Sequence, residues 1–379
     1  MEMNQYKLAD ELDRIFDYLH KHPEVSWEET GTSTYIQSLV SRFDCKVKTY
    51  DDCAGIVVDI GKGAPVVALR ADMDALWQEV HGTFQANHSC GHDAHMTIAL
   101  GVFLTMMENG ISETGTFRFI FQPAEEKGTG ALKMVEKGVV DDVDFLYGMH
   151  LRPAEELANG QFAPAIQHGA ARFIKGTIQG EDAHGARPHL NANAIQVGSE
   201  FFQHLNNIQV DPRIPYSVKM TAFEAGGNSS NIIPGSATFS LDLRAQNNDV
   251  MQQVNDRVDK IASMLGDYHQ VAIHLETNAD VAAAVLDDDA RGMMEEAIMQ
   301  QAGEAGTAPM ITTTGGDDFH FYTLKRPSLK ATMLAIGCDL RPGLHHPEMT
   351  FDRRMIPAAV SILTDVLTRT AKMYNRGEE

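Results

Sequence analysis

Metal-binding residue types lie close together in one short stretch of the chain, Ser89-Cys90-Gly91-His92-Asp93-Ala94-His95. Cys90 and His92 are two residues apart, so both side chains can face one cation from an extended or turning segment. A structural zinc site would need two more such ligands nearby, and no Cys-x-x-Cys pair occurs there. The remaining ligands must come from distant parts of the fold, as is usual for catalytic metals, which keep a position open for water. The alternative is a buried thiol beside a histidine that caps the following helix.

Two pairs of carboxylates follow predicted strands. The strand at 66–70 runs into Asp72 and Asp74, and the strand at 116–121 runs into Glu125 and Glu126. Ligand sites in open α/β sheets lie beyond the carboxyl ends of the strands. Adjacent residues of an extended segment point in opposite directions, so one glutamate can bind a metal while the other stays free to hold a water. The alternative for each pair is a set of solvated charges on a turn.

Histidines supply further candidates. A strand at 145–149 is predicted to end at His150, and a loop carries His345 and His346. A histidine at a strand end can bind a metal, although a lone histidine is more often structural.

The elements that must position these residues follow from apolar periodicity. Residues 7–19 carry apolar side chains at helical spacing, and the apolar run after Cys90 predicts a long helix through 107. Further helices are expected at 32–43, 128–135, 194–205, 250–265, 288–301 and 354–374. Further strands are expected at 56–60, 171–179, 218–225, 236–244, 271–276, 309–313 and 329–336.

The central block from 166 to 284 has a β-α-β-β-α-β order, as in ferredoxin-like units. It lies between two stretches in which helices and strands alternate as in an α/β domain. We therefore expect an α/β catalytic domain formed by residues 1–165 and 285–379, with residues 166–284 inserted as an α+β domain. Polar residues that stand out in the insertion are His184, His189, Asn231 and Arg244.

Composition narrows the function classes. Hydrophobic residues make up 43% and charged residues 22% of the 379 residues, as in ordinary globular proteins. The net charge of −21 disfavours nucleic-acid binding, which needs clustered Lys and Arg. The chain has no run of about 18 apolar residues, so no membrane span is expected. Its first residues are polar and lack the apolar stretch of a secretory signal. A cytoplasmic location with free thiols is the default expectation for the four cysteines at 45, 53, 90 and 338.

The motifs together resemble one known family. The chain looks like the amidohydrolase branch of the aminoacylase/carboxypeptidase metallopeptidases, with hippurate hydrolases, indoleacetic-acid–amino-acid hydrolases and N-acetyl-diaminopimelate deacetylases as relatives. The order and spacing of the motifs carry the resemblance over nearly the whole chain. The motifs are His20-Lys21-His22-Pro23-Glu24, Arg70-Ala71-Asp72-Met73-Asp74-Ala75-Leu76, Cys90-Gly91-His92-Asp93 with His95, Gln122-Pro123-Ala124-Glu125-Glu126, Gly148-Met149-His150, His184 with Pro188-His189, Asn231-Ile232-Ile233-Pro234 and Gly343-Leu344-His345.

The resemblance implies a zinc-exopeptidase-like catalytic domain with a dinuclear metal site, and an inserted ferredoxin-like domain that serves as lid and dimer surface. The implied metal ligands are Cys90, His92, Glu126, His150 and His345. Glu125 would be the general base, and Asp74 would orient a ligand. His184 would reach the reacting carbonyl, commonly from the partner of a homodimer, and Asn231 and Arg244 would contact a small-molecule substrate.

The charges of these residues fit that chemistry. Cys90 as thiolate and Glu126 as carboxylate cancel only half the charge of two dications, because neutral imidazoles cancel none. The residual charge favours ionisation of a water, whose proton Glu125 can take and deliver to a leaving amine. His184 would help to hold the oxyanion, and Arg244 could form a forked bond to a carboxylate. Thiolate and imidazole suit zinc, cobalt and nickel, and manganese also remains open.

We therefore expect a metal-dependent amidohydrolase that cleaves N-acyl amino acids or related amides. A dipeptidase or carboxypeptidase on the same dinuclear site is the alternative. A second alternative is a binding protein without catalytic activity. Such a protein would be free to lose Glu125, so the presence of Glu125 favours an enzyme. A thiol redox protein built on Cys90 is a third.

Departures from the family pattern bear on substrate identity. Trp77 stands where relatives usually have proline, and the segment from Trp77 to Ser89 is shorter than is typical. Gly316-Asp317-Asp318-Phe319 replaces Ser-Glu-Asp-Phe, and His346 replaces a serine. Of the two adjacent histidines, His345 holds the family's ligand position.

Overall fold

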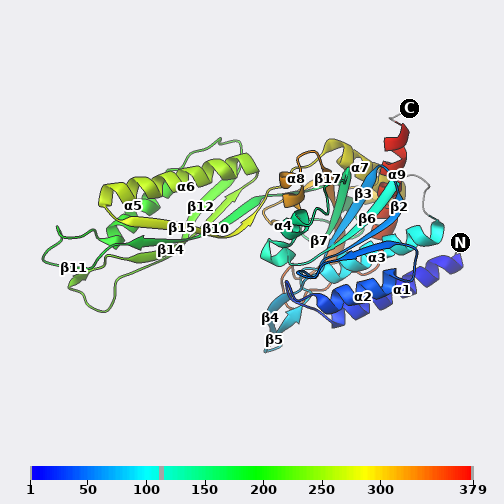
Figure 1. Ribbon diagram of the computed structural model, residues 1–379, viewed down its shortest axis with the longest axis horizontal. Coiled ribbons are helices and arrows are strands. Elements are labelled where there is room, and N and C mark those ends of the chain that lie inside the picture. The colour runs from blue at the N-terminus through cyan, green and yellow to red at the C-terminus, as the bar shows by residue number, and fades with distance from the viewer. Residues whose placement is uncertain (1, 111–114, 377–379) are drawn as a thin grey trace. The chain divides into compact units, whose positions relative to one another are not determined.

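The apolar strands form the centre of a seven-stranded sheet in the computed structural model, which describes residues 2–110 and 115–376 (Figure 1). The strand order is β1-β2-β6-β3-β7-β17-β8. The four central strands β6, β3, β7 and β17 are parallel, and the outer strands pair antiparallel. The bounds are β1 Lys46–Thr49, β2 Ile56–Lys62, β3 Val66–Asp72, β6 Gly115–Gln122, β7 Phe145–Pro153, β8 Phe162–Ala163 and β17 Lys330–Leu340.

Helices cover both faces of this sheet. The chain moves from β3 to β6 in one direction across the sheet and from β6 to β7 in the other. Since crossovers between parallel strands are right-handed as a rule, this change of direction places α3 and α4 on opposite faces. Helices α3 and α9 pack against β3, α1 packs on α3, α7 packs on α9, and α8 packs on α4. The bounds are α1 Glu2–Lys21, α2 Thr30–Val40, α3 His92–Asn109, α4 Gly130–Glu136, α7 Asp288–Gly306, α8 His320–Lys325 and α9 Met355–Arg376.

The pairing of β3 with β7 leaves room for a site. These two strands pair only from Val67 to Leu69, although β7 continues to Pro153. Beyond Leu69, the two strands are joined by hydrogen bonds to the imidazole of His95. Its Nδ1 donates to Asp72 at the end of β3, and its Nε2 accepts from the backbone N–H of Leu151 in β7. The carboxyl edge of the parallel strands is therefore open to side chains.

A second compact unit is formed by residues 168–284 and 313–317, while the other described residues form the first. Its four-stranded antiparallel sheet has the order β12-β14-β10-β15, and α5 and α6 pack against it. The predicted β-α-β-β-α-β order and ferredoxin-like fold are confirmed. The bounds are β10 Ala170–Gln179, α5 Ala194–Asn206, β12 Tyr216–Ala225, β14 Ala237–Ala245, α6 Asn248–His269 and β15 Ala272–Val281.

Period-two patterning explains which sheet face the helices cover in this unit. Alternate residues of β14, from Ala237 to Ala245, are buried, and the residues between them are more exposed. Asn193 and Asn247 accept hydrogen bonds from the first turns of α5 and α6, as good N-cap residues do. A separate short pair joins β11 (Ala183–His184) to β13 (Ile232–Ile233).

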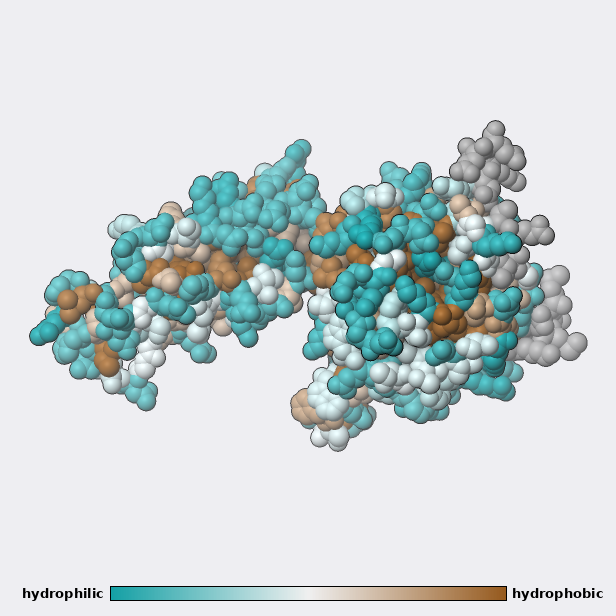
Figure 2. All heavy atoms as spheres, in the orientation of Figure 1, coloured by the Kyte–Doolittle hydropathy of each residue, from teal (hydrophilic) through white to brown (hydrophobic). Residues whose placement is uncertain are grey.

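Residues 76–87 form a hairpin, β4 (Leu76–Val80) and β5 (Thr83–Asn87), which was not predicted. His81 and Gly82 connect the strands and both have positive φ, as in the tight turns that match strand twist. Trp77 and Phe84 are exposed on the hairpin. Figure 2 shows paler and hydrophobic colours there against a largely hydrophilic face.

Other differences concern element ends. The prediction that a strand stops at His150 is wrong, because β7 runs on to Pro153 while paired with β17. Helix α2 ends at Val40 rather than at 43, and β16 (Ile311–Thr313), which pairs with β9 (Ile166–His168), is shorter than predicted. None of the helices in the described residues is long and apolar enough to cross a membrane.

Two helical glycines should respond oppositely to replacement by alanine. A Cβ atom on Gly101 in α3 would lie 2.6 Å from Val360 and 2.7 Å from Leu12, whereas one on Gly292 in α7 would meet nothing within 4 Å. Gly292→Ala should stabilise the protein by up to about 1 kcal/mol through helix propensity. Gly101→Ala should destabilise it, since overpacking costs about 1–3 kcal/mol. Denaturation midpoints of both variants check this, and a rise for Gly101→Ala would contradict the packing.

Candidate metal centre

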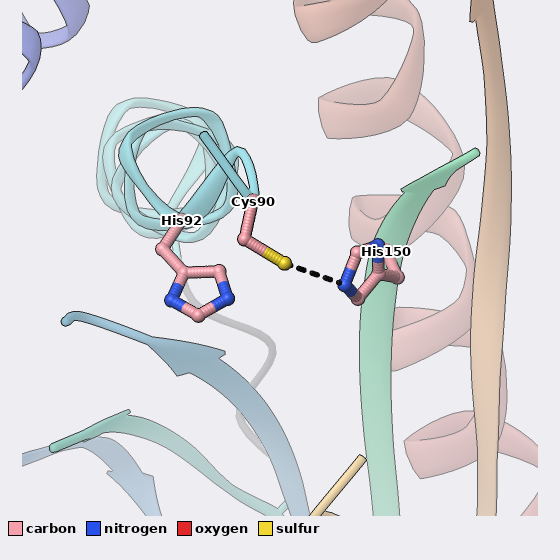
Figure 3. Close-up of side chains that lie close together, drawn as sticks. All are labelled: Cys90, His92 and His150. Atoms are coloured by element: carbon pink, nitrogen blue, oxygen red, sulfur yellow. Dashed lines mark hydrogen bonds between the residues drawn. The ribbon is translucent and has the colours of Figure 1, made fainter. Parts of the chain in front are cut away.

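A left-handed glycine aims the first two candidate ligands. Gly91 has φ +87° and immediately precedes α3, so the chain reverses between Cys90 and His92. A Cβ at Gly91 would come within 2.8 Å of Leu151, which restricts this position to glycine. Cys90 and His92 are both buried, and Figure 3 shows them with His150 around one small space.

Hydrogen bonds at Nδ1 fix the orientation of both buried histidines. His92 Nδ1 lies 2.8 Å from the backbone carbonyl of Asp74, and His150 Nδ1 lies 2.6 Å from that of Leu151. Because a carbonyl can only accept, each Nδ1 carries a proton, which leaves Nε2 as the ring nitrogen that can bind a metal when the imidazole is neutral. Nε2 of His92 is buried with no hydrogen-bond partner among the described residues. Metal-binding histidines are commonly held in this way.

His345 reaches the site from a distant loop. Its backbone N–H donates to Ser89 O at 2.7 Å, and its carbonyl accepts from the Gln78 side chain at 3.1 Å. These bonds tie the loop to the segment before Cys90 and to hairpin strand β4. The adjacent His346 uses its Nδ1 to accept from the backbone of Glu348.

The spacing of the ligand atoms fits two metal positions. Zinc–nitrogen and zinc–sulfur distances predict tetrahedral ligand atoms about 3.3–3.6 Å apart. Cys90 Sγ lies 3.6 Å from His150 Nε2, and Glu126 Oε1 lies 3.4 Å from His345 Nε2. Cys90 belongs to two compact groups, one with His92 and His150 and one with Glu126 and His345. The structure thus brings all five predicted ligands together, with the thiol common to both groups.

Glu126 and Glu125 share a short helical turn, η1 (Glu125–Lys127), after β6. Asp74 accepts from the backbone N–H of Glu125 at 3.1 Å and from that of Glu126 at 3.0 Å. Oε1 of Glu126 is buried and makes no hydrogen bond among the described residues, so it can bind a cation. Oε2 of Glu125 lies 3.8 Å from His92 Nε2. A carboxylate there can exchange a proton with a water beside the ligands.

A buried network of hydrogen bonds around Arg70 lies next to the site. Arg70 donates to Asp72 at 2.6 Å, to Asp318 at 2.7 Å and to Gln122 at 2.8 Å. Burial alone would raise the pKa of Asp72, but the facing His92, His95 and Arg70 side chains hold it well below its usual value. Since both ring nitrogens of His95 are engaged, His95 is not a candidate ligand.

The electrostatics of the cluster favour a cation beside the Cys90 sulfur. Burial, together with the Glu126 carboxylate, raises the pKa of the Cys90 thiol well above its usual value. Burial also holds the pKa of His150 well below its usual value, which keeps that imidazole neutral and able to coordinate. The thiolate form of Cys90 therefore needs a positive charge beside it, as a metal ion provides.

The predicted substrate contacts lie in the second unit. His184 on β11 is exposed, and Asn231 lies next to it, since the backbone carbonyl of Asn231 accepts from Gly185 N. Arg244 on β14 donates to Asp242 at 2.7 Å and stacks 5.0 Å from the ring centre of Phe173.

Sequence reasoning missed several buried polar residues of the site. Arg70, Gln122 and Asp318 were not assigned a role, and neither was Glu29, which is completely buried. Arg70 did carry a signal, since it ends an apolar strand where a charge needs a buried partner. Its partner Asp318 is 248 positions away, which no local pattern reveals.

The fold and the ligand cluster define a class of protein. A mixed sheet in an α/β domain that gathers thiol, imidazole and carboxylate groups at its carboxyl edge, next to a further glutamate, is typical of a metal-dependent hydrolase. Comparison with known proteins makes the family explicit. Residues 68–369 match the model of peptidase family M20/M25/M40. The chain therefore belongs to this family of hydrolases.

Individual relatives align over nearly the whole chain. An IAA-amino acid hydrolase, ILR1-like 4, from Arabidopsis thaliana is 29% identical over 93% of this chain and 83% of its own length. The N-acetyl-L-cysteine deacetylase of Bacillus subtilis (strain 168) is 28% identical over 97% and 90%. The crystal structure of the Bacillus subtilis YXEP protein, a dinuclear metal-binding peptidase from the M20 family, superposes with a TM-score of 0.79 at 23% identity, covering 97% of this chain and 99% of that one.

Metal binding should displace the thiol proton of Cys90. Because burial raises the pKa of Cys90, its thiol is protonated near neutral pH, and coordination as thiolate releases that proton. Calorimetric titration of metal-stripped protein with Zn²⁺, in buffers of different ionisation enthalpy, counts the protons released. Cys90→Ser should release about one proton fewer than wild type.

A matched control is Cys338→Ser. Cys338 is also a buried free thiol, with a pKa raised to about 12, but it lies outside the ligand groups. Its variant should match wild type. Equal release from Cys90→Ser and wild type would remove Cys90 from the ligand set.

Proposed function

We propose that the protein is an amidohydrolase that uses two divalent metal ions to cleave N-acyl amino acids, or closely related amides, into a carboxylate and an amine. The observation that carries the proposal is the position of Glu125, which is not one of the five proposed ligands and whose Oε2 lies 3.8 Å from His92 Nε2. The names of the aligned relatives, hydrolases of acyl amino acids, support this substrate class.

Five side chains are proposed to hold the two metal ions: Cys90, His92, Glu126, His150 and His345. When bound, the ions supply Lewis acidity and lower the pKa of a water. The donor set mixes thiolate, imidazole and carboxylate, which suits zinc, cobalt, nickel and manganese. The spacing of the ligand atoms supports this assignment, and so does the absence of a hydrogen bond to His92 Nε2 or Glu126 Oε1 among the described residues.

The proposed mechanism assigns proton transfer to Glu125. Its carboxylate accepts a proton from the attacking water and then delivers it to the nitrogen of the leaving amine. Asp74 keeps Glu125 in place through the backbone and fixes the tautomer of His92. On the resemblance to the family, His184 is proposed to hold the developing oxyanion.

Substrate recognition is proposed for the second unit. A groove of about 500 Å³ lies within that unit and is lined by Tyr216, Lys219 and Arg244, among others. The Arg244 side chain is 40% exposed and is held by Asp242, so its guanidinium is oriented and still accessible. In a chain of net charge −21, such a group offers a local partner for the carboxylate of an acyl amino acid. Asn231 is proposed as a further contact.

We also propose a homodimer formed through the second unit. Strand β12 is one of the two edge strands of the four-stranded sheet, so its outer backbone groups can pair with another chain. A cytoplasmic location is proposed as well, since all four cysteines are free thiols.

The alternatives are less well supported. A dipeptidase or carboxypeptidase would use the same ligands, but the aligned relatives reported above are named for acyl amino acid substrates. A silent binding protein has no need of Glu125, and a redox role for Cys90 does not explain four other ligands around it.

Glu125→Gln should abolish turnover without loss of metal. The amide keeps the size of the side chain but cannot take a proton, so kcat should fall by about a hundredfold or more. The measurement is hydrolysis of a panel of N-acyl amino acids and free dipeptides by protein reconstituted separately with Zn²⁺, Mn²⁺, Co²⁺ or Ni²⁺, with metal content determined in parallel.

The exposed Glu28→Gln serves as the control and should behave like wild type. Wild-type turnover by Glu125→Gln would exclude Glu125 as the base. Cleavage of dipeptides alone would favour the dipeptidase alternative.

His184→Ala should lower kcat while metal content stays unchanged, because the imidazole is proposed to act on the substrate. Mixing tests whether it acts across a dimer. If His184 serves the partner's site, hybrids of His184→Ala with Glu125→Gln contain one complete site, and the mixture should regain activity after subunit exchange. If verified hybrids recover no activity, His184 acts in the site of its own chain. If His184→Ala loses metal, His184 is a metal ligand.

A further inference from the structure

Glu29 is a buried carboxylate that the proposed mechanism does not use. It precedes α2 in the acidic stretch Trp27-Glu28-Glu29-Thr30, yet its side chain is completely inaccessible. It makes no ion pair among the described residues, and its Oε2 has no hydrogen-bond partner there. A carboxyl group is rarely buried in this way without a specific role.

Its other oxygen bonds the backbone of the catalytic turn. Oε1 of Glu29 accepts from the N–H of Ala124 at 2.8 Å. Ala124 has φ +53° and ψ +42°, a left-handed conformation that non-glycine residues seldom adopt, and it immediately precedes Glu125. The hydrogen bond from Glu29 is therefore made to the residue with the unusual backbone conformation, Ala124.

Asp74 completes the arrangement. It accepts the next two backbone N–H groups, those of Glu125 and Glu126. Three successive N–H groups thus end on two buried carboxylates of the chain itself. The directions in which the Glu125 and Glu126 side chains leave the turn depend on these bonds, because the backbone dihedrals at Ala124 set the orientation of the residues that follow.

We propose that Glu29 is a positioning residue of the metal centre, which holds Ala124 in its left-handed conformation and so aims Glu126 at the metal and Glu125 at the water. The inference rests on the proposed function for the role of Glu125. Its effect on Glu126 as a ligand can be measured without any turnover.

A second glutamate of the same segment provides a matched control. Glu24 accepts from the N–H groups of Gly31 and Thr32 at the start of α2, and it makes no hydrogen bond to the 124–126 turn. Replacing Glu24 by alanine disturbs the same stretch of chain but leaves the turn alone. Any effect that is only structural should therefore be shared by Glu24→Ala and Glu29→Ala.

The conservative variant is Glu29→Gln. Its amide oxygen can still accept from Ala124 N, and its NH₂ group replaces an oxygen that has no partner. Burial raises the pKa of Glu29 to about 7, so the neutral side chain is already accessible to the wild-type protein near neutral pH. We expect Glu29→Gln to keep most of the function that Glu29→Ala loses.

The experiment titrates metal-stripped wild type, Glu29→Ala, Glu29→Gln and Glu24→Ala with Co²⁺, followed by visible absorption and by metal content. In Glu29→Ala, one Co²⁺ equivalent should bind at least about tenfold more weakly with an altered ligand-field spectrum, as is common when a residue that supports a ligand is lost. In the same variant, kcat should fall by about tenfold or more while KM changes little. Glu29→Gln should restore both, and Glu24→Ala should leave both unchanged.

Two outcomes would overturn the proposal. One is a Glu29→Ala protein with wild-type Co²⁺ affinity, spectrum and kcat. The other is a Glu24→Ala protein that loses metal affinity as much as Glu29→Ala does. If Glu29→Ala does not fold, Glu29→Asp decides, since its shorter side chain should weaken Co²⁺ binding relative to Glu29→Gln, and equal binding would contradict the role. Altered Co²⁺ binding without amidase activity in wild type would reject the proposed function and keep the positioning role.

Discussion

The carboxylate of Asp74 is the constraint on which the geometry of the metal centre depends. It is 1% exposed and accepts hydrogen bonds from the Ser26 hydroxyl and from the backbone of Glu125 and Glu126, while its own backbone carbonyl accepts from His92. Hydrogen bonds to a charged group contribute about 1.5–3 kcal/mol each. One residue therefore fixes a histidine from α3 through its backbone and a pair of glutamates after β6 through its carboxylate, although these elements do not adjoin in sequence.

Left-handed backbone recurs at three of the turns that carry residues of the site. Gly91 comes before His92, Ala124 comes before Glu125, and His345 itself has φ +65°. For the non-glycine residues this conformation costs about 1–3 kcal/mol, which is comparable to one charged hydrogen bond. The loops keep these conformations because the neighbouring segments bind their backbones, as Ser89 does for His345. The parallel strands provide a rigid frame, and the backbone conformations of the turns set the directions of the side chains of the site.

Much of the fold and the ligand set could be predicted from sequence because both produce local patterns. The apolar run of β3 indicates a strand buried on both faces, and Cys90 and His92 lie two residues apart. The rest depends on distant pairing. Glu29 looks like one of several surface acids, since nothing near it indicates that the turn at 124 will cover it. The β4–β5 hairpin was missed because Leu76–Val80 mixes polar and apolar residues without a strict alternation.

The placement of Trp77 on the exposed hairpin has a spectroscopic consequence. The chain contains two tryptophans, Trp27 and Trp77, and both belong to the first unit. Indole emission therefore reports on the metal-binding unit alone, while the ferredoxin-like unit contributes only weaker phenolic light from its tyrosines. An unfolding curve followed by tryptophan emission and one followed by circular dichroism need not coincide here, and their separation would resolve the melting of each unit without any added label.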